Sequence, residues 1–148
     1  MTAKTQPAAP LPTELPAPRW IRWARWIWVI GFAEGLGAHL WDVGTGGLHA
    51  YRSAPLPAQL LFHALLLLDP LVVVLLLRRR PSAAPIGAAV MALDVAANWW
   101  ADAPLLAGDP AGVLLRPYGL PVITLFGCFV LATARPLHRE LTRTVTRG

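Results

Sequence analysis

The stretch LLFHALLLLDPLVVVLLLRRR, residues 60–80, decides the fold class. It is long enough to cross the hydrocarbon core of a bilayer, which takes about 20 mostly apolar residues in a helix. Three arginines end the run, and the pair Asp69–Pro70 interrupts it. An apolar run of this length bounded by positive charge predicts a transmembrane helix over about residues 58–77.

Three further segments have the same character, over about residues 23–41, 86–103 and 118–134. Pro- and Gly-rich breaks separate the four segments, and such breaks end helices. Of the 148 residues, 55% are hydrophobic and only 14% are charged, less charge than a soluble domain of this size carries. We therefore expect an all-α integral membrane protein, an antiparallel four-helix transmembrane bundle within residues 19–135.

The basic residues predict the orientation. Eleven of the 13 Lys and Arg residues precede the first span or follow the second or fourth, whereas only Arg52 and Arg116 fall on the other side. By the positive-inside rule, both termini are cytoplasmic, and we expect the cytoplasmic membrane of a bacterium. The net charge of +5 does not indicate a nucleic-acid partner, because the charges lie where apolar runs stop.

Membrane anchors are expected at the cytoplasmic boundary, where Arg and Trp alternate in PRWIRWARWIW, residues 18–28. Arginine pairs with headgroups, and tryptophan favours the membrane–water interface. The residues assigned to this role are Arg19, Trp20, Arg22, Trp23, Arg25, Trp26, Arg78, Arg79 and Arg80.

Two terminal segments flank the spans. Residues 1–18 hold five prolines and little apolar periodicity, which predicts a disordered tail rather than a cleaved signal peptide. Residues 136–148 form a basic cytoplasmic tail in this interpretation. Its arginines recur every four residues, so it is either a helix on the inner leaflet or a solvated tail.

Three carboxylates fall inside the predicted spans at one level. Counted from the cytoplasmic boundary at the helical rise, Glu34 lies roughly 16 Å deep, and Asp69 and Asp94 roughly 12 Å. A charge at the bilayer centre costs about 2.5 to 3.5 kcal/mol on insertion scales. No Lys or Arg shares their depth, so protonation, pairing with histidine or a hydrated cavity must accommodate them. Each option predicts that they face the bundle interior.

Further polar residues lie above these carboxylates, toward the outside. Asp94, Asn98 and Asp102 recur every four residues and form one stripe on a helix. The candidate ligand- or proton-binding residues are Glu34, Asp69, Asp94, Asn98, His63 and His39.

Small residues at a spacing of four in the first span indicate close packing against a neighbouring helix. The two pairs are Gly31 with Gly35 and Ala33 with Gly37. This close contact would help to bury Glu34.

The pair Asp69–Pro70 predicts a kink in the second span. Proline lacks an amide hydrogen, and its ring clashes with the carbonyl four residues earlier. Asp followed by Pro is also a common helix start, so Asp69 is expected to cap the half-helix that follows.

Cofactor chemistry has weak support in the sequence. The single cysteine, Cys128, cannot form an intrachain disulfide. His39 and His63 are the one pair that could ligate haem b from two helices, and His39, Asp42 and His63 the one set for a metal. No compact ligand motif accompanies them, so no metal site or cofactor is predicted. No nucleophile-elbow, P-loop or dinucleotide motif occurs, and no catalytic residue is assigned.

Three functions stay open. The first is an outward-facing polar cavity that binds or transports protons or a small cationic or amphipathic ligand. The second is a structural or accessory subunit, in a homo-oligomer or a membrane complex, whose buried acids hold helices together. The third is an enzyme acting on membrane lipid. The bilayer is the expected partner in each case.

Overall fold

The computed structural model describes residues 18–116 and 118–145, and all regular elements in that part of the chain are helical. The tail predicted over residues 1–18 lies outside it except for Pro18, and so do the last residues, 146–148. The elements are α1 (Arg19–Gly46), the short 3₁₀ helix η1 (Gly47–His49), α2 (Leu56–Leu77), α3 (Ala83–Gly108), α4 (Pro110–Leu114) and α5 (Leu120–Val145).

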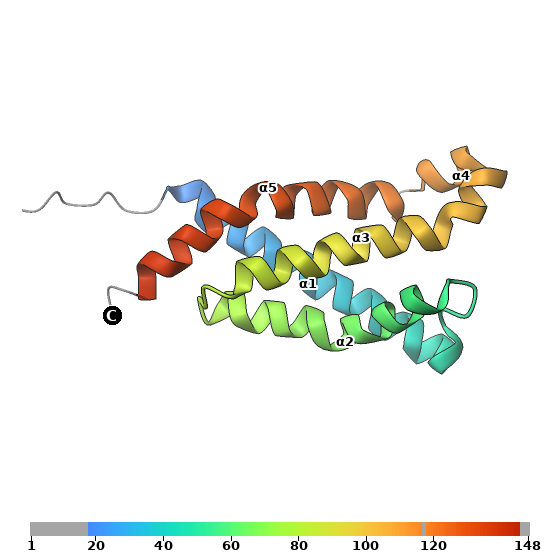
Figure 1. Ribbon diagram of the computed structural model, residues 1–148, viewed down its shortest axis with the longest axis horizontal. Helices are drawn as coiled ribbons and strands as arrows, with labels where there is room; N and C mark the ends of the chain where they lie inside the picture. The colour runs from blue at the N-terminus through green and yellow to red at the C-terminus, as the bar shows by residue number, and fades with distance from the viewer. Residues whose placement is uncertain (1–17, 117, 146–148) are drawn as a thin grey trace, which may run out of the picture.

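The four long helices pack side by side as a bundle (Figure 1). Each packs against its neighbour in the sequence, and α1 against α5 closes the ring. Short connections make consecutive helices antiparallel. The predicted all-α helical bundle is therefore confirmed.

Two of the described helices are long and apolar enough to cross a membrane: α2 and the Leu120–Arg143 part of α5. The other two long helices, α1 and α3, do not reach that apolarity. They carry most of the intramembrane acids, amides and histidines that the sequence predicts, which lowers their mean hydropathy.

The ends of α3 and α5 differ from the predicted span boundaries because each helix continues past a proline. Pro104 lies within α3, which continues to Gly108, and Pro136 lies within α5. The short helix α4 was not predicted. Its start is capped by Asp109, whose Oδ1 accepts a hydrogen bond of 2.9 Å from the amide of Gly112.

The predicted break at Asp69–Pro70 is not observed. Helix α2 continues through Pro70 as one element, and its N-cap position is Pro55 rather than Asp69. The Asp–Pro start predicted here occurs instead at Asp109–Pro110. Asp69 cannot cap, because its side chain is buried among the helices. A bend at Pro70 stays a prediction.

The predicted C-terminal tail is part of the bundle as far as Val145. Leu137 and Leu141 belong to the core, with 1% and 3% of their surfaces exposed. Figure 1 shows the last part of α5, in red, turning away from the direction of the rest of that helix. The imidazole Nδ1 of His138 donates a 2.9 Å hydrogen bond to the carbonyl of Pro81, which ties α5 to the α2–α3 turn.

Trp28 fills the centre of the core. Its side chain is fully buried, and its indole Nε1 donates a 2.9 Å hydrogen bond to Thr133 of α5. The ring occupies the space above Gly87, where an added Cβ would stand 2.7 Å from an indole carbon. Trp99 makes the corresponding 2.9 Å bond to Thr124, so two indoles fasten α5.

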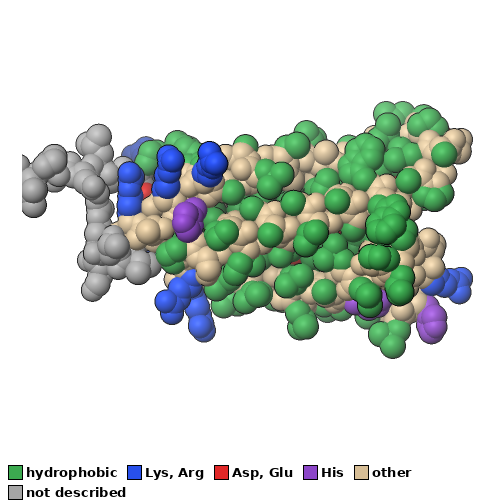
Figure 2. All heavy atoms as spheres, in the orientation of Figure 1, with side chains coloured by type: hydrophobic (Ala, Val, Ile, Leu, Met, Phe, Trp, Pro, Cys, Tyr) green, Lys and Arg blue, Asp and Glu red, His purple; other side chains and the backbone are tan. Residues whose placement is uncertain are grey.

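The outer face of the bundle is apolar, and the charges gather at its ends. Figure 2 shows Lys and Arg side chains at the two ends of the visible face, most of them where α5 finishes. We call that end, where α1 and α3 begin and α2 and α5 finish, the basic end. Large apolar side chains are exposed on every long helix, among them Ile30 and Trp41 of α1, Leu60 and Leu67 of α2, Leu93 and Trp100 of α3, and Leu125 and Leu131 of α5.

Candidate functional site

A cavity of about 510 Å³ lies within the half of the bundle away from the basic end. Most of its walls come from α1 and α5, with α3 and one residue of α2 completing them. Five of the six candidate residues line it, together with Asp42. The polar side chains of this polar cavity are Glu34, His39, Asp42, Asp69, Asp94 and Asn98.

Asp69 and Asp94 are the buried acids of the cavity. Only 4% and 7% of their surfaces are exposed. They come from the adjacent helices α2 and α3 and are close enough to interact electrostatically. One carboxylate oxygen of Asp69 lies 3.1 Å from the position that a Cβ on Gly35 would take. The missing side chain of Gly35 thus makes room for this carboxylate.

Asn98 orients Asp94. Its amide Nδ2 donates two 2.9 Å hydrogen bonds, one to the Asp94 carboxylate and one to the Asp94 backbone carbonyl. The predicted stripe on α3 is therefore joined by hydrogen bonds at its first two members. Asp102, the third member, does not line the cavity.

Glu34 lines the cavity but is exposed, so its predicted burial is wrong. Successive residues on a helix point about 100° apart, and Gly35 rather than Glu34 faces α2. Of the predicted small-residue pairs, Gly31 and Gly35 point inward, against the Phe126 ring and Asp69. Ala33 and Gly37 are exposed.

Tyr51, which sequence reasoning missed, joins the polar cavity to the η1–α2 connection. The Tyr51 hydroxyl donates a hydrogen bond of 3.3 Å to the Asp42 carboxylate. Nδ1 of His39 lies 2.9 Å from the hydroxyl oxygen of Tyr51. A phenol has one hydrogen, so His39 must donate in this arrangement. Burial, and then the charge of Asp42, raise the pKa of Tyr51 above its ordinary value.

His63 is not part of the cavity wall. Its Nδ1 is hydrogen-bonded to the carbonyl of Gln59 at 2.8 Å, and its Nε2 is buried without a partner in the described part of the chain. The ring meets Tyr51 edge-on, with centroids 5.1 Å apart. His63 therefore contacts Tyr51 rather than lining the candidate site.

The two histidines that were considered as haem ligands, His39 and His63, do not leave room for a haem between them. The Tyr51 ring lies against both imidazoles, 6.0 Å from His39 and 5.1 Å from His63, and only His39 borders the polar cavity. A haem between two axial histidines needs that space. Within residues 18–116 and 118–145, no three His, Cys, Asp or Glu side chains are arranged to hold a metal ion, so His39, Asp42 and His63 do not form a metal site.

An aromatic layer closes the cavity toward the basic end. Phe32 and Phe126 line the cavity and meet edge-on, with centroids 5.9 Å apart. Trp28 lies 6.0 Å from Phe32 and is fully buried. These three rings fill the core between the cavity and the basic end.

The chemistry of the cavity is that of a site for positive charge. Four carboxylates and one imidazole line it, and no Lys or Arg does so among the described residues. Such a set can share protons or surround a cation. Comparison with protein-family models, curated protein sequences and solved structures finds no match to the chain.

Proposed function

We propose that the chain is a small multi-pass protein of the bacterial cytoplasmic membrane whose polar cavity binds protons or a small cationic or amphipathic ligand from the outer side. All four long helices cross the bilayer in this proposal, and both termini are cytoplasmic.

The distribution of apolar surface supports four spans. A soluble protein rarely exposes a contiguous apolar patch of more than a few hundred Å². Here large apolar side chains are exposed on α1 and α3 as well as on α2 and α5, while two acids are buried inside. At the helical rise, α1 and α3 are about 42 and 39 Å long, enough for a core of about 30 Å.

The basic end supports the orientation. It gathers arginines from the start of α1, the α2–α3 turn and the end of α5, as cytoplasmic boundaries do. The exposed Trp20, Trp23 and Trp26 lie beside them. The Arg25 guanidinium stands 5.6 Å from the centre of the Trp26 ring.

One observation carries the ligand class: Asp69 and Asp94 are buried together in a cavity that no Lys or Arg of the described residues lines. Two adjacent carboxylates in an apolar setting favour either a bound proton or a bound cation, because either one lowers the repulsion between the two negative charges. The exposed Glu34 and Asp42 extend this negative potential to the surface of the bundle.

The test compares three aspartates of the same bundle. Asp69→Asn and Asp94→Asn should each weaken binding of tetraphenylphosphonium, measured by calorimetry in detergent, by at least about tenfold, because a buried charge partner is lost. They should also reduce proton flux in proteoliposomes that carry an internal pH dye.

Asp102→Asn is the matched control. It makes the same charge change on α3 outside the cavity wall, and it should leave binding and flux unchanged. Folded Asp69→Asn and Asp94→Asn variants that bind and conduct like the wild type would overturn the proposal.

A structural role is the second candidate, favoured by the hydrogen bonds between Asn98 and Asp94. In that case the acids hold helices of this chain, or of a membrane complex, together. Asp94→Asn would then be tolerated, whereas Asp94→Leu would lower the thermal stability. The wild type itself would not bind tetraphenylphosphonium.

A further inference from the structure

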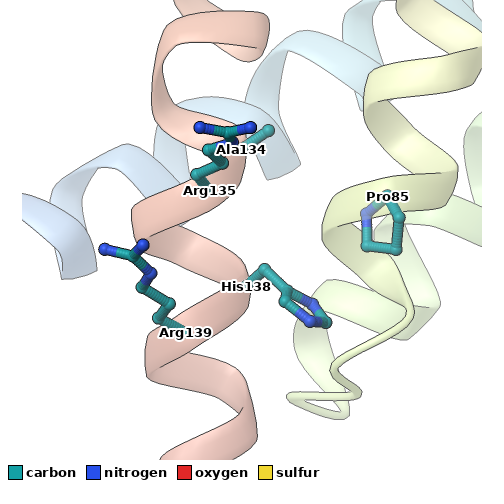
Figure 3. Close-up of a pocket in the computed structure, with 5 residues that line it drawn as sticks. All are labelled: Pro85, Ala134, Arg135, His138 and Arg139. Carbon is teal, nitrogen blue, oxygen red and sulfur yellow. The ribbon is translucent and has the colours of Figure 1, made fainter.

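A second hollow lies at the basic end, between the beginning of α3 and the last part of α5 (Figure 3). Its volume is about 340 Å³, and it is distinct from the polar cavity, with which it shares no residue. The residues that line it are Pro85, Ala134, Arg135, His138 and Arg139.

The lining is almost entirely apolar, and the guanidinium groups of Arg135 and Arg139 lie beside it rather than inside it. Pro85, Ala134 and the aliphatic stems of the arginines provide the apolar part. Arg135 and Arg139 extend from the same side of α5, while His138 points toward α3 (Figure 3). Both arginines are exposed, and within the described residues neither makes a hydrogen bond or an ion pair.

The hollow is built into the fold rather than carried on a loose tail. Leu137, next to it in the sequence, is buried in the core, and His138 is hydrogen-bonded to the carbonyl of Pro81. These contacts hold the last part of α5 against the α2–α3 turn. The arginines therefore project from a packed helix.

The neighbouring turn adds positive charge at a position where the backbone favours glycine. Arg79 has a φ of 52°, and the amide of Arg80 bonds to the carbonyl of Leu75 at 2.9 Å, as in a helix end that glycine usually occupies. A side chain in this conformation costs of order 1 kcal/mol or more. Arg79 also lies close enough to Arg25 of α1 for the two charges to repel. Charges that are kept together at such a cost indicate an anionic partner.

We infer that this hollow binds an anionic glycerophospholipid, with its phosphate between Arg135 and Arg139 and an acyl chain over the apolar wall. Guanidinium groups bind phosphate oxygens in pairs, and the apolar wall suits a lipid better than a free anion. The inference rests on the membrane placement proposed above but not on the chemistry of the polar cavity. Under that placement, the hollow lies at the level of the inner-leaflet headgroups.

The test uses native mass spectrometry of the full-length protein in mild detergent, titrated with palmitoyl-oleoyl phosphatidylglycerol or phosphatidylcholine. The wild type should bind phosphatidylglycerol in preference to phosphatidylcholine. The double variant Arg135→Gln/Arg139→Gln should lose that preference, with about fivefold weaker binding for each arginine removed.

The matched control is Arg52→Gln/Arg116→Gln, which removes the same charge at the opposite end of the bundle. It should retain the preference. Arg135→Lys/Arg139→Lys keeps the charge but loses the paired geometry, so it should bind with intermediate affinity.

Three results would overturn the inference: equal binding of the two lipids to the wild type, an unchanged preference in the folded Arg135→Gln/Arg139→Gln variant, or displacement of the lipid by millimolar inorganic phosphate. The last would identify a free-phosphate site. Failure here leaves the cavity proposal untouched if Asp69→Asn still weakens tetraphenylphosphonium binding, and the arginine variants should bind that probe normally.

Discussion

The two halves of the bundle are built from the same four helices but are filled differently. Near the basic end, the Trp28 ring occupies the centre and Gly87 makes room for it. In the other half, Gly35 makes room for the carboxylate of Asp69, and a cavity of about 510 Å³ follows. A glycine on a facing helix admits an indole in one half and a carboxylate in the other.

This difference teaches that the cavity depends on a few side-chain volumes rather than on the helix arrangement. Protein interiors are close-packed, so a single large ring removes free space and a missing Cβ creates it. We call the half of the bundle near the basic end the dry half and the half that holds the cavity the polar half. The aromatic layer of Trp28, Phe32 and Phe126 forms the boundary between them. The predictions below alter one half at a time.

The largest effect is expected from Trp28→Ala, which removes the central side chain of the dry half. Removal of a fully buried indole leaves a large cavity and removes the hydrogen bond to Thr133, so the free energy of unfolding should fall by about 3 to 5 kcal/mol. Thermal and denaturant unfolding in detergent measure it. Trp99→Ala is the control, because Trp99 makes a similar hydrogen bond but is largely exposed. A loss no greater than that of the control would contradict the packing role assigned to Trp28.

A smaller effect is expected from Gly35→Ala, which alters the polar half by filling the space that the Asp69 carboxylate occupies. The new methyl group would stand 3.1 Å from the Asp69 carboxylate and displace it, at a cost of about 1 to 3 kcal/mol. Binding of tetraphenylphosphonium should weaken in parallel. Gly37→Ala lies two residues away with no atom within 4 Å, so it should gain up to about 1 kcal/mol from helix propensity. Equal stability of the two variants would refute the close contact between Gly35 and Asp69.

The smallest effect concerns Tyr51, at the edge of the polar half. Tyr51→Phe loses the hydrogen bonds to His39 and Asp42 and should cost about 1 kcal/mol. Because the pKa of Tyr51 is raised in the folded protein, this contribution is complete below pH about 10, the pKa of an unfolded tyrosine, and is lost as pH rises through the folded value.

Absorbance at alkaline pH gives the check on that pKa. In the wild type, Tyr51 should ionise at a higher pH than a free tyrosine does, and this step should disappear in Tyr51→Phe. Asp42→Asn should lower the pKa of Tyr51 toward its ordinary value. Ionisation of Tyr51 at its ordinary pKa would show that Tyr51 is not buried beside Asp42.

Much of the fold could be predicted because apolar runs and proline breaks are local signals. They located the four long helices, including the Leu-rich α2. They misplaced the ends of α3 and α5, because a proline signals a break even where packing carries the helix past it, as at Pro104 and Pro136. They also predicted a helix start at Pro70 that is not observed. Leu137 and Leu141 show the packing that overrides the break in α5.

The candidate site could be predicted only in part. Acids and amides within apolar runs are conspicuous, and Asp69, Asp94 and Asn98 do line one cavity. Their ligand-binding role stays a prediction. The exposure of Glu34 depends on which side of α1 meets α2, and depth alone does not contain that information. Tyr51 was missed because it lies in a connection without periodicity, and the one available signal was an aromatic hydroxyl beside polar loop residues.

The closure of the ring by α1 and α5 has a consequence for biogenesis. Helix α5 follows the other three long helices in the sequence, yet it supplies Val122, Ile123 and Phe126 to the wall of the polar cavity. Under the proposed placement, Asp69 and Asp94 would enter the bilayer before that wall exists, facing lipid or the insertion machinery. The hydrogen bonds from the indoles of Trp28 and Trp99 to threonines of α5 can form only after α5 has packed against α1 and α3. Nascent chains that stall before α5 is inserted should therefore be degraded by quality-control proteases, because Asp69 and Asp94 are not yet covered.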